Sequence, residues 1–114
     1  MQSQSLSRSL AEYVEGLAYK DLPQDVIERA KISILNVFAG SFAGWDLPCS
    51  RIAMKAGENF PGKSTVWAYG NKTDPAEAAM ANATMAHSVM IEDFALGLGH
   101  PGDSVVPPAI AVAE

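Results

Sequence analysis

The chain has 114 residues, of which 48% are hydrophobic and 18% charged. This length suits one domain with a core, and the composition excludes a disordered or low-complexity chain. The net charge is −5 and the basic residues form no run, which argues against nucleic acid binding. Cys49 is the only cysteine, so a disulfide within the chain is excluded and a reducing compartment is expected.

The N-terminal segment MQSQSLSRSLAEYVEG lacks the apolar core of a signal peptide. The longest uncharged apolar stretch, residues 32–45, is shorter than the ~20 residues that cross a bilayer. We therefore expect a soluble cytoplasmic protein with no nucleic acid or membrane partner.

Two amphipathic helices are predicted first. Ser5 is the expected N-cap of the first, whose apolar face comprises Leu6, Leu10, Tyr13, Val14 and Leu17. The second begins at Pro23 or Gln24, and its predicted buried side comprises Val26, Ala30, Ile34, Val37 and Phe38. Because it is nearly uncharged from residue 32 onward, its second half is expected to be buried on most sides.

A third helix is predicted over about residues 49–59, followed by an extended segment at 64–69. The pattern leaves this segment open between a lone strand and a loop, before a turn at Gly70 and Asn71. Asp74 is then predicted to cap an alanine-rich helix that starts at Pro75 and ends near His87.

A last helix is predicted to begin after Asp103 or Ser104, with Pro107 or Pro108 in its first turn. It reaches Glu114 without the glycine, basic residues or proline that normally end a helix. We therefore expect a chain cut inside an element, and an all-α fold of about five helices with one short extended segment.

The candidate catalytic residues are concentrated in the segment AHSVMIEDFALGLGHPGDSVVPPAIAVAE, which contains both histidines. No GxGxxG, Walker-type or HExxH motif occurs. With the alanine-rich helix before it, the glycine loop, His100-Pro101-Gly102 and the following Val-Val-Pro-Pro, this segment resembles the N-terminal part of the MmgE/PrpD family. Upstream, Leu22-Pro23, the run Ile34-Leu35-Asn36 and the segment Ser64-Thr65-Val66-Trp67 match in order.

The resemblance implies a lyase or isomerase of small polycarboxylates that uses no iron–sulfur cluster, and we expect no cofactor. Family members dehydrate 2-methylcitrate, decarboxylate cis-aconitate or epimerise iminodisuccinate. The resemblance also implies a homodimer, and a second α+β domain after the helical one. Residues 1–114 would then be a partial helical domain, the N-terminal portion of a larger protein and inactive alone.

One position departs from the family pattern. When the two histidines are aligned without a gap, the family's site aspartate falls at Met90, whose thioether cannot exchange a proton. A local shift of three residues would instead place Asp93-Phe94 at the family's Asp-aromatic pair. The alternative is a non-catalytic helical interaction domain that has lost the aspartate.

The predicted catalytic residues are His100, Asp93 and His87, and the predicted substrate-binding residues are Ser104 and Asn82. An imidazole can transfer a proton next to a carboxylate, and the helix start after His100 favours an anion. His87 has the alternative of a helix C-terminal cap, and Asp93 that of a solvated side chain. Metal binding by the histidines with Glu92 and Asp93 is conceivable, but structural zinc spacings are absent and no metal is predicted.

Overall fold

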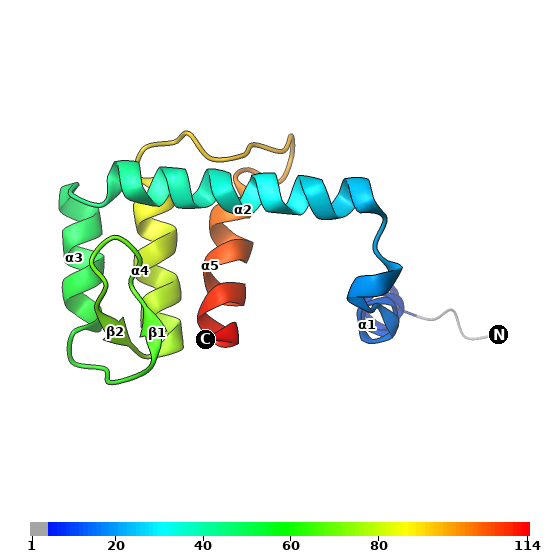
Figure 1. The fold of residues 1–114 in the computed structure, drawn as a ribbon, viewed down its shortest axis with the longest axis horizontal. Helices are drawn as coiled ribbons and strands as arrows, with labels where there is room; N and C mark the ends of the chain where they lie inside the picture. Colours follow the sequence, from blue (N-terminus) through cyan, green and yellow to red (C-terminus); the bar gives the residue numbers. More distant parts are fainter. Residues whose placement is uncertain (1–4) are drawn as a thin grey trace. The chain divides into compact units, whose positions relative to one another are not determined.

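The computed structural model of the protein describes residues 5–114. These residues cluster into two compact units, the first ending at Ala30 and the second comprising Lys31–Glu114. The described residues form mainly helices, as predicted (Figure 1). In chain order the elements are α1 (Leu6–Gly16), the 3-10 helix η1 (Tyr19–Asp21), α2 (Gln24–Gly44), α3 (Pro48–Gly57), β1 (Ser64–Thr65), β2 (Lys72–Thr73), α4 (Pro75–His87) and α5 (Pro101–Ala113).

The first unit contains α1, which begins where the sequence predicted. Its N-cap is Ser5, whose hydroxyl oxygen accepts the backbone N–H of Arg8 at 3.4 Å. None of its residues is buried, and Leu6 and Val14 are 75% and 67% exposed. The apolar face read from the sequence is therefore present on α1 but uncovered.

Helix α2 begins at Gln24 as predicted, but its buried side is shorter than expected. Its buried residues are Val37, Gly40, Ser41 and Gly44. The predicted burial of Val26, Ala30 and Ile34 is wrong, since all three are exposed, and Phe38 is half-buried. The buried residues of α2 begin at Val37, which packs with Ala86 of α4 and Val106 of α5.

In the second unit, α4 lies between α3 and α5, and the last turns of α2 run across one end of these helices (Figure 1). That end holds the start of α3, the end of α4 and the start of α5. Helix α2 approaches α4 closely at Gly44, since a Cβ at this position would collide with the Met85 carbonyl and the Ser88 hydroxyl. A side chain at residue 44 would therefore push α2 away from α4.

Two small clusters of apolar side chains hold the second unit together. One has Ala53, Val66, Ala81 and Met85 at its centre, and the other has Val37, Ala86 and Val106. Residues of α4 take part in both, so its alanine-rich sequence serves close packing on two sides.

The extended segment after α3 is half of a hairpin. Strand β1 pairs antiparallel with β2, with Ser64 opposite Thr73 and Thr65 opposite Lys72. The predicted short extended segment is present, but neither alternative left open for residues 64–69, a lone strand or a loop, describes it, because β1 has a partner and residues 67–70 turn back toward β2. A strand of two residues carries too little alternation for its pairing to show in the sequence.

Helix α5 begins at Pro101, before the predicted start, with His100 at its N-cap and no side-chain cap hydrogen bond. Asp103 and Ser104 consequently lie in its first turn, and Pro107 and Pro108 lie inside the helix. Within residues 5–114, no helix is both long and apolar enough to cross a membrane.

Candidate functional site

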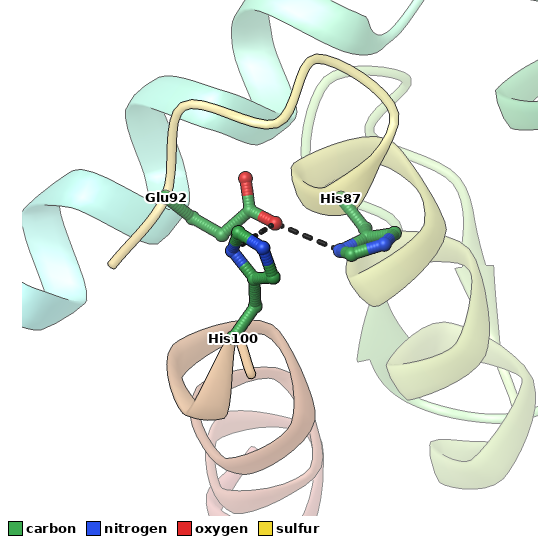
Figure 2. Close-up of side chains that lie close together, drawn as sticks. All are labelled: His87, Glu92 and His100. Carbon is green, nitrogen blue, oxygen red and sulfur yellow. Dashed lines mark hydrogen bonds and ion pairs between the residues drawn. The ribbon is translucent and has the colours of Figure 1, made fainter. Parts of the chain in front are cut away.

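Three side chains meet where α4 ends and α5 begins. His87 is the last residue of α4, His100 is the N-cap of α5, and Glu92 lies in the loop that joins the two helices. Figure 2 shows the Glu92 carboxylate reaching toward both imidazole rings. The end of α4, the following loop and the start of α5 thereby bring the three side chains together at the end of the second unit that α2 crosses.

Glu92 is the centre of this cluster. Its Oε1 atom lies 2.8 Å from Nδ1 of His87 in a hydrogen bond, and 3.3 Å from Nδ1 of His100. The Glu92 side chain is fully buried, the His100 side chain is 18% exposed and that of His87 is 50% exposed. The cluster therefore has a buried carboxylate within and one imidazole open to solvent.

Two buried polar atoms of the cluster have no hydrogen-bond partner among the described residues: Oε2 of Glu92 and Nδ1 of His100. The contact of His100 Nδ1 with Glu92 is short enough for an ion pair, but its angles do not make it a hydrogen bond. Unpartnered buried polar atoms are rare in folded proteins because each loses its hydration. These two atoms are consequently free to bind a ligand.

A second carboxylate borders the cluster. Oδ2 of Asp103 lies 2.6 Å from Nδ1 of His87, and Oδ1 of Asp103 accepts the Ser104 hydroxyl at 2.9 Å. His87, Asp103 and Ser104 also line a pocket of about 380 Å³, together with Cys49, Ala83, Thr84 and Ser88. This pocket is the solvent-accessible side of the site.

Asp93 has a different position from its neighbour Glu92. Its Oδ1 atom accepts the backbone N–H of Gly102 at 2.9 Å, in the first turn of α5. One of the free N–H groups expected to attract a substrate anion is thus already bonded to a carboxylate of the protein. Asp93 thereby fixes the loop to the start of α5.

The loop between α4 and α5 has unusual backbone geometry. Met90 has a φ of 54°, the only positive value among non-glycine residues of the described chain, and Gly97 and Gly99 have φ of 82° and 77°. A β-bridge joins Ala95 to Gly99, and the Phe94 ring packs edge-on against His100 at 5.5 Å between centroids. The loop is folded back so that His100 returns to the end of α4.

The structure brings together part of the predicted site. His87 and His100 are neighbours, with ring centroids 5.2 Å apart, and Ser104 lines the adjoining pocket. Asn82 is fully buried elsewhere, where its amide oxygen accepts Trp67 N–H and its amide nitrogen donates to Thr65 O. Those bonds hold the hairpin segment to α4, and substrate contact by Asn82 stays a prediction.

Sequence reasoning missed two members of the site. From the sequence, Glu92 was named only as a conceivable metal ligand, with solvation as the alternative, and Asp103 only as one of two possible helix caps, but both contact His87. Their spacing from His87 matches no known motif, so only the return of the loop places them. The apolar neighbour Ile91 would not have indicated the burial of Glu92 either, since Ile91 is 54% exposed in the structure while Glu92 is buried.

The charge of the site is carried by carboxylates and imidazoles. The ion pairs of Glu92 and Asp103 within residues 5–114 are with histidine rings. An anionic substrate would meet acidic groups here unless cationic groups are added, since like charges repel strongly at low dielectric.

Comparison with known proteins identifies the family. The model of the MmgE/PrpD N-terminal domain matches residues 8–114. This chain belongs to the MmgE/PrpD family. The resemblance noted around His100-Pro101-Gly102 is confirmed, and the match covers nearly the whole chain.

Several relatives are cis-aconitate decarboxylases. The enzyme of Aspergillus terreus is 32% identical over 111 residues, which are 96% of this chain and 23% of the relative. The human enzyme is 30% identical over 117 residues, covering 100% of this chain and 24% of the relative. This chain thus spans about a quarter of the length of the curated relatives it matches. No solved structure matches the chain.

Proposed function

We propose that this chain supplies one part of a lyase or isomerase site that transfers a proton at the carbon next to a carboxylate of a small polycarboxylate. The observation that carries the proposal is the position of His100, at the N-cap of α5 and beside the buried Glu92. An imidazole held in this way can give or take a proton, and the N–H groups at the start of α5 that Asp93 does not occupy favour the anion that develops.

Residue roles follow from the contacts. His100 is the proposed proton-transfer group, and Glu92 lies 3.3 Å from its Nδ1 atom as the positioning carboxylate. His87 faces the pocket with Ser104, where a substrate carboxylate or hydroxyl has room to bind. Asp93, proposed from the sequence as catalytic, contributes by holding the loop against Gly102.

The substrate class rests on the relatives. Since the relatives named above are cis-aconitate decarboxylases, a cis-aconitate-like tricarboxylate is the first substrate to test, with 2-methylcitrate next. The acidic surroundings of the site imply that the cations needed to bind such a substrate come from residues beyond this quarter of the protein. Activity in the cytoplasm, as a homodimer, is part of the proposal.

A chimaera tests the proposal directly. Residues 1–114 replace the matching segment of the Aspergillus terreus cis-aconitate decarboxylase, and release of carbon dioxide from cis-aconitate is measured. We expect turnover in the chimaera, a loss of at least about a hundredfold with His100→Gln, and none with the isolated chain. A folded, inactive chimaera, or full activity with His100→Gln, would contradict the proposal.

Met90 supports a second candidate, a helical interaction domain without catalytic activity. Met90 occupies the position of the family's site aspartate when the histidines are aligned, and it is 58% exposed with no ionisable group. Met90→Asp in the chimaera separates the two candidates. A rise in turnover favours a site weakened at this position, whereas inactivity of both chimaeras when folded favours the interaction domain.

A further inference from the structure

We propose that His87, Glu92 and His100 form a binding site for a divalent transition metal ion of the zinc class. Each residue offers one ligand atom, and these atoms all lie within 4.8 Å of one another (Figure 2). A tetrahedral zinc ion with bonds of roughly 2.0–2.2 Å holds its ligand atoms about 3.3–3.6 Å apart. The 3.3 Å between His100 Nδ1 and Glu92 Oε1 already matches that spacing.

Unpartnered buried atoms give independent support. Oε2 of Glu92 and Nδ1 of His100 are buried and lack a hydrogen-bond partner among the described residues. An ionised carboxylate without full pairing is costly to bury, and metal coordination is one of the few ways in which proteins compensate this cost. A bound ion would satisfy Nδ1 of His100, which the polypeptide leaves without a hydrogen-bond partner.

The charge around the ligands favours a divalent cation. Besides Glu92, Asp103 presents Oδ2 at 2.6 Å from Nδ1 of His87, with its side chain only 10% exposed. Two largely buried carboxylates beside two imidazoles attract a doubly charged ion more strongly than a singly charged one. Asp103 lies near enough to His87 to strengthen this attraction without being one of the three ligands.

The donor atoms select the class of metal. Two imidazole nitrogens and one carboxylate oxygen suit Zn²⁺, Ni²⁺ and Co²⁺, whereas Mg²⁺ and Ca²⁺ prefer oxygen ligands. Access is available because the His87 side chain is half-exposed and lines the pocket. Binding would join the end of α4, the loop and the start of α5 through one ion, which should stabilise the folded chain.

The test is calorimetric titration of the untagged 114-residue chain with Zn²⁺, and with Mg²⁺ for comparison. We expect one Zn²⁺ per chain, little Mg²⁺ binding and a Tm that rises with Zn²⁺ concentration. Glu92→Gln and His100→Ala should each weaken Zn²⁺ binding at least about tenfold. A bound ion would occupy His100 and the Glu92 carboxylate, so the proton transfer proposed above belongs to the metal-free site. Calorimetry needs no turnover, and it therefore tests metal binding separately from the lyase activity.

Two variants serve as controls. Cys49→Ser removes the thiol that lines the pocket, and Asp46→Asn removes a carboxylate whose partner is Arg51. Both should bind Zn²⁺ with the affinity of the unchanged chain. Circular dichroism checks the fold of each variant, and His87→Gln, at a half-exposed position, replaces any ligand variant that does not fold. Absence of saturable Zn²⁺ binding, or affinity unchanged in the folded ligand variants, overturns the proposal.

Discussion

Asp93 accepts the backbone N–H of Gly102 at 2.9 Å, and this bond joins the loop after α4 to the first turn of α5. It holds His100, two residues before Gly102, beside the loop residue Glu92. The geometry of the candidate site therefore depends on a contact made by neighbours of the site residues.

Gly102→Ala should destabilise the second unit by about 1–3 kcal/mol, because the added Cβ would collide with the Asp93 carboxylate and lie 2.9 Å from Cγ2 of Val37. Urea unfolding followed by circular dichroism measures the change. Gly16→Ala is the matched control, since its Cβ would meet no atom within 4 Å. Equal stability of Gly102→Ala and the unchanged chain would show that the first turn of α5 is not packed as described.

Met90→Gly should raise the free energy of unfolding by about 0.5–1 kcal/mol. Met90 has a φ of 54°, which costs an L-residue energy and a glycine almost none, and its side chain is 58% exposed. Met90→Val should lower stability instead, because branching at Cβ makes this conformation more strained. Thermal unfolding provides the check: the melting temperature of Met90→Gly should lie above that of the unchanged chain, and the melting temperature of Met90→Val below it.

Asn82→Ala should lower stability by about 2 kcal/mol or more. The change leaves the backbone N–H of Trp67 and the carbonyl of Thr65 without the partners that Asn82 supplies within its buried site. Asn59→Ala, at an exposed position, is the control and should change stability by no more than about 0.5 kcal/mol. A mild effect of Asn82→Ala would mean that its hydrogen bonds are not structural.

Glu114 should contribute stability that depends on pH. The side-chain hydrogen bond from Thr65, then its backbone N–H, lowers the pKa of Glu114 below its ordinary 4.5, with Lys72 adding attraction and desolvation opposing. A group whose pKa is lower in the folded state stabilises above its unfolded pKa, and this stability is lost as pH falls through the folded value. The stability difference between the unchanged chain and Glu114→Gln should therefore be present at pH 7 and shrink below about pH 4.5. A difference that stays constant across this range would contradict the assignment.

The local elements were determined largely by the sequence. Ser5 and Asp74 cap their helices through side-chain bonds to the next turn, and the helix starting at Pro75 ends at His87 as predicted. Caps and alanine-rich runs act within a few residues, so their effect can be read without knowing the fold. The family could also be recognised from the sequence, because the resemblance rests on motifs such as His100-Pro101-Gly102.

Only the tertiary structure decided which of these residues share a site. The sequence placed His87 and His100 on separate elements and left Glu92 in a loop, whereas the folded loop buries Glu92 between them. It also assigned burial to Ile34, which is 38% exposed, whereas the buried residues of α2 begin at Val37. Burial and proximity depend on where distant segments meet, and a periodic pattern along one helix contains no information about that meeting.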